Sequence, residues 1–405
     1  MSPDALRVAI FTESYLPYLS GVTVSTEGLA RGLGAAGHRV LVVAPRPANG
    51  EPAGHAGAPG PEPEYAWLPS YQAPSPVPPG YRMPVPFVGD AMLRAREFAP
   101  DVVHAQSPFV TGLMARRLSQ RVGAPLVFTH HTRFGDYGHY LGPLARPGSA
   151  VAGAYLRDFW AGCAAIVAPG SELAEEIRAR LGPERAGRVH VIPTGIDVAA
   201  IRGLAAVDAR RRFGWPADAV VAVSVGRLAA EKSVALLVEA FALAAAGDPR
   251  LRLLLVGGGP AEAALRRRAA APDLAGRVGI TGRLPRLEAL ALARGADLFA
   301  FASRTETQGL VLAEALAAGL PVVAVAGPGV RDSVRDGIDG MVLASGPDIE
   351  VAARLAATLV ALAGDPPRLA ELAAAAAADA DRFDLSRRIE EMVALYRTVL
   401  TAPRA

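Results

Sequence analysis

The chain has 405 residues, of which 51% are hydrophobic and 20% charged, so it predicts two or three folded domains and excludes a disordered chain or a single small module. The net charge of +3, from 42 basic and 39 acidic residues, argues against a nucleic-acid-binding protein. Cys163 is the only cysteine, which excludes an intrachain disulfide. Because the N-terminus also has no basic region followed by an apolar run, we expect a cytoplasmic protein.

Short runs rich in Val, Ile and Leu alternate along the chain with longer segments of helical period. Runs of this kind predict strands at Val8–Phe11, Val40–Val43, Val102–His104, Leu126–Phe128, Ile166–Ala168, Val189–Ile192, Val220–Val225, Leu253–Val256, Val278–Ile280, Leu298–Phe301 and Val322–Val325. Continuous apolar strands separated by helices are typical of parallel sheets covered on both faces. The alternation occurs twice, which predicts an α/β protein with two doubly wound, Rossmann-like domains.

The turn-rich linker Pro193-Thr194-Gly195-Ile196-Asp197 separates the two predicted domains. We therefore expect residues 1–193 to form an N-terminal domain and residues 194–384 a C-terminal domain. The last segment, 385–405, is predicted to be helical as far as Leu400 and is followed by no strand. The stretch Pro45–Pro86 holds 13 prolines in 42 residues and predicts a long irregular loop whose role the sequence does not define.

A pair of cations follows the first strand of the second half. The motif runs from Gly226 to Lys232, with Arg227 five positions before the lysine, and Lys232 is the only lysine in the chain. An arginine fork and a lysine ammonium on one loop can embrace a diphosphate through charge-assisted hydrogen bonds. The alternative is a solvated junction between loop and helix. Survival of a single lysine among arginines favours a functional role.

Two carboxylates eight residues apart, Glu306 and Glu314, follow the strand predicted at Leu298–Phe301. The spacing places one in a loop and the other inside the helix predicted over Leu310–Ala318. Loops of this kind lie at the carboxyl ends of parallel strands, where ligands bind. Gly309 permits close backbone approach, and the helix start offers unpaired N–H groups to anions. The alternative is two solvated carboxylates.

The N-terminal half carries two weaker signals. Gly21 lies in the first loop between strand and helix, where a glycine permits backbone contact with a phosphate. His130 and His131 follow the strand at Leu126–Phe128, and their adjacency without a further ligand at metal-site spacing favours substrate contact over a metal site.

Three other patterns are better explained without a ligand. The run Gly257-Gly258-Gly259 lacks the spacing of a dinucleotide fingerprint and is interpreted as a strand-end turn. The pair Asp379 and Asp381 follows an alanine-rich helix rather than a strand, so a solvated helix end is expected instead of a metal–nucleotide site. The run Arg266-Arg267-Arg268 is interpreted as a solvated helix face.

Together these motifs resemble the retaining family-4 glycosyltransferases of the GT-B fold, over nearly the whole chain. The stretch His131–Tyr140 and the phrase Thr305–Gly309 are most similar to the bacterial diacylglycerol glycosyltransferase branch. Many relatives have Gly-Gly where this chain has Ser20-Gly21, and Lys-Gly where it has Lys232-Ser233. The resemblance implies a GT-B architecture of two domains facing across a cleft, with the C-terminal helix crossing back to the N-terminal domain.

The resemblance also implies an acceptor bound by the N-terminal domain and a UDP- or GDP-type sugar donor seated mainly on the C-terminal domain, with a role for each motif residue toward that donor. Arg227 and Lys232 would hold the donor diphosphate, Glu306 the sugar hydroxyls, and Glu314 the ribose hydroxyls. Further donor contacts are expected at Gln308, Gly309, Leu310 and Gly21, while His131 would sit beside the reacting sugar. The expected catalytic set is therefore His131, Arg227, Lys232 and Glu306.

No metal or other cofactor is expected, because two cations can stabilise the departing diphosphate. Two helical turns would place Glu314 about 10 Å or more from Glu306, too far for a double-displacement pair at one anomeric carbon. The resemblance instead implies front-face substitution with retention, in which a donor phosphate oxygen takes the acceptor proton.

The acceptor stays open at this point. A membrane glycerolipid is one alternative; a soluble aminocyclitol or sugar is another, and a catalytically silent nucleotide-binding relative is a third. The segment from Arg82 to Arg157 contains nine arginines and four acidic residues. Within it, Val88, Met92 and Ala95 could form an apolar helix face beside Arg94 and Arg96. That pattern predicts either peripheral contact with the inner face of the cell membrane or a helix packed on its own sheet.

Overall fold

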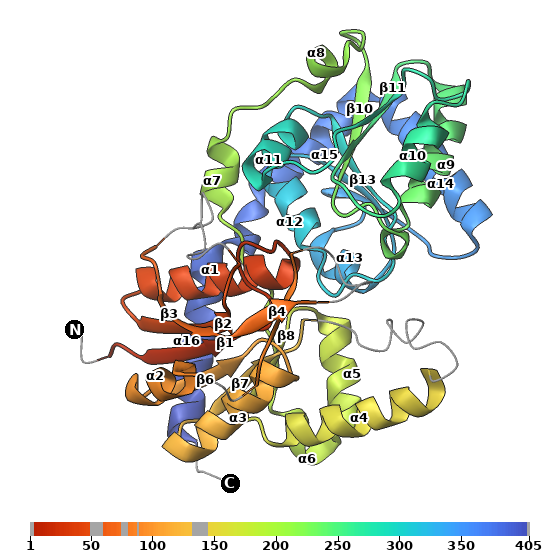
Figure 1. Ribbon diagram of the computed structural model, residues 1–405. Helices are drawn as coiled ribbons and strands as arrows, with labels where there is room; N and C mark the ends of the chain where they lie inside the picture. Colours follow the sequence, from red (N-terminus) through yellow and green to blue (C-terminus); the bar gives the residue numbers. More distant parts are fainter. Residues whose placement is uncertain (1–3, 49–59, 74–79, 87–88, 132–144, 403–405) are drawn as a thin grey trace. The chain divides into compact units, whose positions relative to one another are not determined.

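The computed structural model describes residues 4–48, 60–73, 80–86, 89–131 and 145–402. It divides the chain into two compact units, shown in Figure 1. The N-terminal unit comprises residues 1–195 and 385–405, and the C-terminal unit comprises residues 196–384.

Among the described residues of the N-terminal unit, seven parallel strands form one sheet in the order β3-β2-β1-β6-β7-β8-β9. Its strands are β1 (Arg7–Phe11), β2 (Arg39–Pro45), β3 (Glu64–Leu68), β6 (Val102–Ala105), β7 (Leu126–Thr129), β8 (Ala165–Ala168) and β9 (Val189–Val191). Its helices are α1 (Gly21–Ala35), α2 (Ala91–Glu97), α3 (Val110–Val122), α4 (Ala145–Ala161), α5 (Ser171–Leu181), α6 (Pro183–Ala186) and α16 (Leu385–Thr401).

Strand β1 shows why this sheet is covered on both faces. Ala9 and Phe11 belong to one buried cluster, with side chains of α2, α3, α4 and α5, while Val8 and Ile10 belong to another, with α1 and α16. Successive strand residues point to opposite faces, so a continuous apolar run is buried only between two helical layers.

The C-terminal unit repeats this plan with six parallel strands in the order β12-β11-β10-β13-β14-β15. Its strands are β10 (Val220–Val225), β11 (Leu251–Val256), β12 (Val278–Ile280), β13 (Leu298–Phe301), β14 (Val322–Val325) and β15 (Gly340–Leu343). Its helices are α7 (Val198–Gly203), α8 (Ala209–Phe213), α9 (Val234–Gly247), α10 (Glu262–Ala269), α11 (Arg286–Arg294), α12 (Leu310–Ala317), α13 (Pro328–Ser333), α14 (Asp348–Gly364) and α15 (Pro366–Ala378), with 3₁₀ turns η2 (Ala230–Lys232) and η3 (Ala380–Phe383). Buried clusters on both faces make this a second doubly wound unit.

All the predicted strands are present, but four others were missed. Strand β15 is short and half-exposed, and β3 contains Tyr65 and Trp67 rather than a run of aliphatic residues. The prediction of an irregular stretch over Pro45–Pro86 was wrong for its described parts, because β3 extends the sheet and β4 (Ser70–Gln72) pairs with β5 (Arg82–Pro84) as an antiparallel ribbon. Residues 49–59 and 74–79 of that stretch lie outside the described residues.

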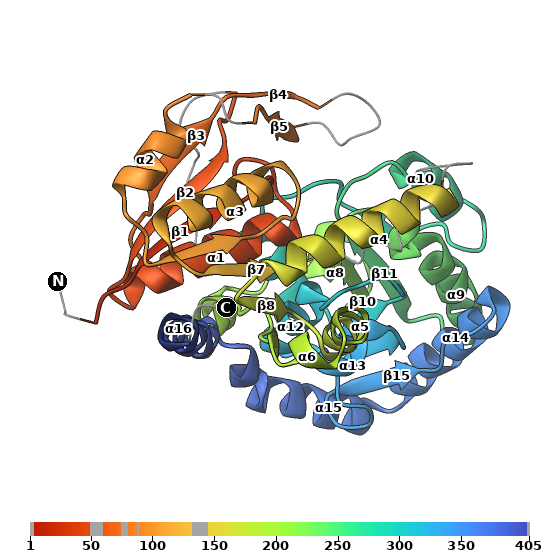
Figure 2. The same ribbon diagram turned by 90° about the horizontal axis from the view of Figure 1, so that it is seen from below.

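The last helix confirms the predicted return of the chain. Helix α16 packs against α1 in the N-terminal unit, and both views show the two helices side by side (Figure 2). A Cβ on Gly32 of α1 would lie 2.6 Å from a side-chain carbon of Ile389 on α16, so the helices meet where there is no side chain. The hydroxyl oxygen of buried Tyr396 lies 2.6 Å from Nδ1 of His104 on β6. Apolar packing and one buried hydrogen bond thus hold α16 on the sheet.

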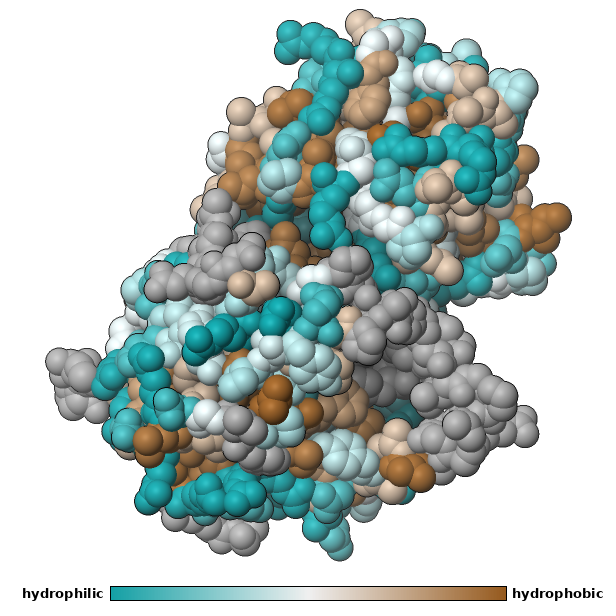
Figure 3. All heavy atoms as spheres, viewed as in Figure 1, coloured by the Kyte–Doolittle hydropathy of each residue, from teal (hydrophilic) through white to brown (hydrophobic). Residues whose placement is uncertain are grey.

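Of the two alternatives for the apolar face of α2, the structure shows the second, a helix packed inside the N-terminal unit. Ala95 of α2 is fully buried and Met92 packs against the same core, while Arg94 and Arg96 are exposed. Val88 lies outside the described residues. On the face shown in Figure 3, hydrophobic residues are scattered among hydrophilic ones in each unit. Within the described part of the chain, no helix is both long and apolar enough to span a bilayer.

Candidate active site

The loop that carries Arg227 is built by glycines. Gly226 has φ +152°, and a Cβ on Gly257 would lie 1.8 Å from the carbonyl oxygen of Gly226. Similarly, a Cβ on Gly259 would lie 2.3 Å from the carbonyl oxygen of Leu228. The Gly257–Gly259 turn therefore has a second role beyond ending β11: only residues without a side chain allow this close approach to the cation loop.

Lys232 forms an ion pair with Glu306, which joins two motifs that lie 74 residues apart in sequence. The Lys232 side chain is 32% exposed and that of Glu306 is 17% exposed, so the pair is only partly solvated. The backbone supports the pairing, because Thr305 Oγ1 donates to the carbonyl of Glu231 at 3.0 Å and Gly329 N donates to the carbonyl of Glu306 at 3.1 Å. The carboxyl ends of adjacent strands β10 and β13 hold both loops.

Arg227 lies on the same loop but is bound differently. Its Nη1 is 3.3 Å from Oε1 of Glu231, and its side chain is 46% exposed. The structure thus places Arg227 and Lys232 on one strand-end loop, each beside a carboxylate. Glu231 was not singled out in the sequence, where it is one of many solvated-looking acids.

Glu314 is paired separately from Glu306. It lies in α12 with little exposure, and Oε1 accepts from Arg286 Nε at 3.1 Å and from Arg286 Nη2 at 2.5 Å. Arg286 begins α11 and was missed, because one arginine among 41 carries no signal in a sequence. The two carboxylates therefore have separate cationic partners and do not form a pair with each other.

The start of α12 matches the predicted loop-to-helix geometry. Gly309 precedes the helix with φ +69°, a conformation that costs glycine little, and Leu310 is the first helical residue. The neighbouring Gln308 accepts through its backbone carbonyl from Ser333 Oγ at 3.0 Å. The predicted donor residues Gln308, Gly309 and Leu310 thus lie directly between Glu306 and Glu314 at this helix N-terminus.

In the N-terminal unit, a cavity of about 280 Å³ opens at the carboxyl ends of β1, β6 and β7. Its lining includes His131, whose Nε2 is 2.7 Å from Oε1 of Gln106. Burial lowers the pKa of His131 to about 4, so the imidazole is neutral near pH 7. The predicted stretch after His131, residues 132–140, lies outside the described residues.

Glu13 lines the same cavity and was also missed. Its Oε2 accepts from Ser107 Oγ at 2.9 Å, and its Oε1 accepts from Thr111 N at 3.1 Å, at the start of α3. Burial raises the pKa of Glu13, although its hydrogen bonds oppose that shift. The motif Thr12-Glu13-Ser14 directly after a predicted strand could have drawn attention to it.

Gly21 is the first residue of α1, and a Cβ there would meet no described atom within 4 Å. Packing in this unit therefore does not require glycine at this position. Ser20, which departs from the Gly-Gly pattern noted above for many family members, is the N-cap of α1 and accepts from Thr23 N at 3.1 Å. The departure from the family pattern thus supplies a helix cap.

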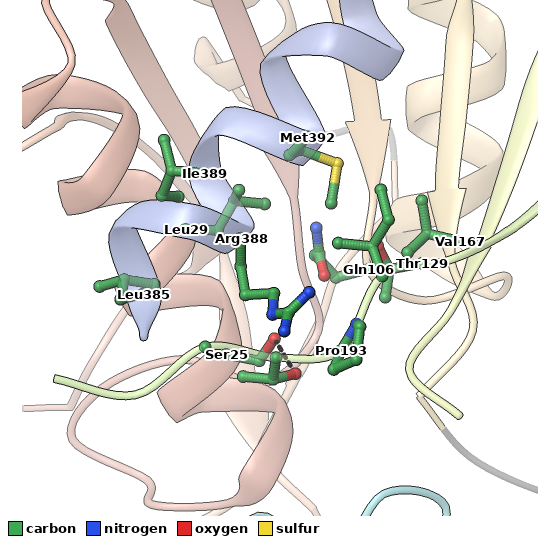
Figure 4. Close-up of a pocket in the computed structure, with 13 residues that line it drawn as sticks. Ser25, Leu29, Gln106, Thr129, Val167, Pro193, Leu385, Arg388, Ile389 and Met392 are labelled. Carbon is green, nitrogen blue, oxygen red and sulfur yellow. Dashed lines mark hydrogen bonds between the residues drawn. The ribbon is translucent and has the colours of Figure 1, made fainter. Parts of the chain in front are cut away.

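A smaller cavity of about 30 Å³ lies beneath α16 and shares Gln106 with the larger one (Figure 4). It is lined mainly by apolar side chains such as Leu29, Ile389 and Met392. Gln106 Nε2 is buried and has no hydrogen-bond partner among the described residues.

His130, the other histidine of the predicted pair, is buried against the rings of Phe128 and Trp160. Within the described ranges, no group of three or more His, Cys, Asp or Glu side chains could hold a metal ion.

Two doubly wound units with cations and carboxylates at the strand ends define a glycosyltransferase of the GT-B fold. Residues 19–200 match the family described as Glycosyltransferase Family 4, and residues 207–376 match Glycosyl transferases group 1. The chain belongs to the family-4 glycosyltransferases, as predicted.

Two named enzymes are similar to this chain over most of its length. The chain is 30% identical over 328 residues to an alpha-monoglucosyldiacylglycerol synthase of Acholeplasma laidlawii, covering 78% of this chain and 80% of that protein. It is 34% identical over 310 residues to a D-inositol 3-phosphate glycosyltransferase of Thermobispora bispora, covering 74% and 71%.

Solved structures confirm the fold. The sucrose-phosphate synthase of Thermosynechococcus elongatus superposes with a TM-score of 0.75 at 20% identity, covering 98% of this chain and 100% of that one. Anabaena Alr3699/HepE, solved in complex with UDP and glucose, superposes with a TM-score of 0.70 at 20% identity, covering 97% and 100%.

Proposed function

We propose that this glycosyltransferase moves a hexose from a UDP- or GDP-type sugar donor to an acceptor hydroxyl, with retention at the anomeric carbon and without a metal ion. The observation that carries the proposal is the pair of separate contacts Lys232–Glu306 and Arg286–Glu314 in the C-terminal unit. Each joins a carboxylate of the motif to a cation at the strand ends, where nucleotide ligands bind in open α/β sheets.

Breaking the anomeric bond leaves negative charge on the departing nucleoside diphosphate. Arg227 and Lys232 on the β10 loop are the cations proposed to stabilise that charge, because preorganised cations act most strongly where charge develops. When Lys232 turns to a phosphate, the Glu306 carboxylate is released to accept from sugar hydroxyls. The start of α12 offers backbone N–H groups to the same diphosphate.

Retention is proposed to follow front-face substitution. A double displacement needs two carboxyl groups about 5 Å apart at the anomeric carbon, whereas Glu306 and Glu314 are held by different cations. In the proposed step, the acceptor oxygen bonds to the anomeric carbon as the bond to the diphosphate oxygen breaks. A donor phosphate oxygen takes the acceptor proton. His131 beside the reacting sugar and Gly21 near the phosphates remain predictions from the resemblance.

For the acceptor we propose a membrane glycerolipid. The support is the similarity to the alpha-monoglucosyldiacylglycerol synthases of Acholeplasma laidlawii and Streptococcus pneumoniae. Such an acceptor implies peripheral contact with the inner face of the cell membrane. Because α2 buries its apolar face, that contact would depend on exposed arginines such as Arg94 and Arg96 and would weaken with added salt.

A panel of nucleotide sugars read by thermal shift tests the donor, because a ligand that binds only the folded protein raises its melting temperature. Radiolabelled transfer to diacylglycerol vesicles tests the acceptor, and NMR of the product tests retention. An inverted anomeric linkage would refute the mechanism. A melting shift without transfer to any alcohol would support the catalytically silent alternative.

A further inference from the structure

The cavity at the ends of β1, β6 and β7 has an unusual charge distribution. Its described lining comprises Glu13, Ser14, Tyr18, Ser20, Val22, Tyr81, Gln106, Ser107, Pro108, Phe109, Phe128 and His131. Glu13 is the only carboxylate in this set, which contains no lysine or arginine. Burial keeps His131 neutral near pH 7, so the described lining offers the Glu13 carboxyl group no cationic partner.

The Glu13 carboxylate is held in place but not saturated. Oε2 accepts from Ser107 Oγ and Oε1 accepts from Thr111 N, and the backbone N–H of Val110 also hydrogen-bonds the carboxylate. The two oxygens of a carboxylate can together accept about four hydrogen bonds, so these three leave room for one more. Both backbone donors belong to the first turn of α3, whose positive end favours the charged form of the carboxylate.

The remaining wall suits an alcohol. Hydroxyls of Ser14 and Ser20 lie 2.9 Å apart, and the Tyr18 and Tyr81 rings meet edge to face with centroids 5.4 Å apart. Phe109, 44% exposed and stacked on Tyr155, adds an apolar surface. A volume of about 280 Å³ is close to the lower limit of small-molecule sites, about 300 Å³.

We propose that Glu13 accepts a hydrogen bond from a hydroxyl of an acceptor bound in this cavity and thereby selects uncharged alcohols over phosphorylated ones. This inference rests on the proposed function, since it names the acceptor class for that reaction. A phosphate placed beside the Glu13 carboxylate would be repelled in a partly dehydrated site. Both possible acceptors, a lipid and a free polyol, share this chemistry: each is an uncharged compound with a hydroxyl group.

The test compares matched acceptors. One pair is inositol and inositol 3-phosphate; the other is diacylglycerol and phosphatidylglycerol, both in neutral phosphatidylcholine vesicles. For the wild type we expect kcat/KM for the uncharged member to exceed that for its phosphorylated partner by about thirtyfold or more. The pair that is glycosylated identifies the source of the alcohol. Equal or better use of the phosphorylated member would overturn the proposal.

Glu13→Gln keeps the size of the side chain and removes its charge. We expect the KM for the uncharged acceptor to rise about tenfold or more, because a hydrogen bond to a charged group is lost. The ratio of kcat/KM between the uncharged and the phosphorylated acceptor should fall. The matched control is Glu97→Gln, which changes an exposed glutamate on α2 and should leave both values unchanged. If Glu13 only caps α3, E13Q will lower the melting temperature but leave KM within twofold of wild type, and the proposal fails.

If E13Q does not fold, Ser107→Ala removes only the hydroxyl that donates to Oε2 and should also raise the acceptor KM. The donor-induced melting shift separates the two proposals. No melting shift and no transfer with any nucleotide sugar would refute the proposed function, and this inference with it. Measurable transfer with an E13Q KM equal to that of wild type would refute the role of Glu13 alone.

Discussion

Lys232 is the residue at which composition and structure agree most closely. It is the only lysine in the chain, and the structure places it against Glu306 at adjacent strand ends. A point ammonium on a flexible stem can move from a carboxylate to a phosphate with little cost in geometry, whereas a planar guanidinium needs a matching fork. That chemical difference explains why arginine would not serve equally well here.

Substitution of the two cations tests this assignment. We expect Lys232→Ala and Arg227→Ala each to reduce kcat by about 30- to 1000-fold while the protein stays folded, because each removes a cation from the site where charge develops. Lys232→Arg should also be impaired. Arg267→Ala, on the exposed face of α10, is the control and should be fully active. Near-native transfer by K232A, measured with saturating donor, would refute the role of Lys232.

Ser233, next to Lys232, has φ +50° and ψ +32°. A side chain in this left-handed conformation costs about 1–2 kcal/mol. Glycine removes that cost, but it also gives the unfolded chain more conformational freedom, which offsets part of the gain in stability. We therefore expect Ser233→Gly to raise the free energy of unfolding by up to about 1 kcal/mol, as measured by urea denaturation. A clear loss of stability would show that the serine side chain makes a compensating contact.

Several histidines make stability depend on pH. Burial lowers the pKa of His38, His104, His131 and His190, to about 3 for His104 and about 4 for His131. The unfolded chain binds protons at these side chains near pH 6.5 while the folded chain does not, so stability is lost as the pH falls below about 6.5. We expect the melting temperature to decrease from pH 7 to pH 5, because the free energy of unfolding falls by up to about 1.4 kcal/mol per pH unit for each histidine that stays neutral in the folded chain. His104→Gln cannot take up a proton and should reduce that slope; an unchanged slope would contradict this account.

At the scale of elements, close approaches of backbone decide how the loops and the last helix are placed. Gly257 and Gly259 let the end of β11 support the cation loop, and Gly195 allows the linker to touch the start of α16, where a Cβ would lie 2.5 Å from the Cα of Leu385. Beside it, Ile196 N donates to the carbonyl of Phe383 at 2.9 Å. The chain passes between the units twice, at residues 195–196 and at residues 384–385. Backbone contacts link these two passages, one contact lying in each unit.

Helix α16 depends on one buried hydrogen bond as well as on apolar packing. Tyr396→Phe removes the hydroxyl that meets His104 Nδ1 and leaves that nitrogen buried without its partner. We expect a loss of about 1–3 kcal/mol in the free energy of unfolding. Tyr71→Phe, at an exposed position of β4, is the control and should change stability by less than about 0.5 kcal/mol. A Tyr396→Phe protein as stable as wild type would mean that water or a rotated side chain replaces the bond.

At the scale of the whole molecule, the division into two doubly wound units separates the residues proposed to bind the donor from the cavity proposed for the acceptor. Arg227, Lys232, Glu306 and Glu314 all lie in the C-terminal unit, whereas His131 and the cavity lie in the N-terminal unit. Changes in one unit should therefore leave ligand binding by the other intact. The donor-induced melting shift is the measurement that tests this independence.

We predict that sugar transfer by this protein does not require a metal ion. Because Arg227 and Lys232 are proposed to neutralise the diphosphate, excess EDTA should leave the transfer rate nearly unchanged. The measurement is the initial rate with and without chelator, followed by addition of Mg²⁺ or Mn²⁺. A complete loss of activity that either ion restores would show that a metal, not the two cations, stabilises the leaving group.

The sequence by itself determined the class of fold, because a strand covered on both faces must be apolar along its whole length, and that pattern survives in any single chain. It also indicated Arg227, Lys232, Glu306 and Glu314, since each lies in the loop or the helix that follows a recognisable strand. It failed for β3, where aromatic residues within a proline-rich stretch hide the strand. For α2 it left two alternatives open, because an apolar stripe has the same pattern whether a membrane or a sheet covers it.

Only the tertiary structure decided which side chains meet. Glu306 pairs with Lys232 and Glu314 with Arg286 across separations of 74 and 28 residues, and Glu13 shares a cavity with His131 although 118 positions separate them in the sequence. Partners so distant leave no local periodicity, and one arginine or glutamate among many gives no signal of its own. The parallel sheets bring such residues together because their strands all end at one edge, and that convergence is a property of the folded chain.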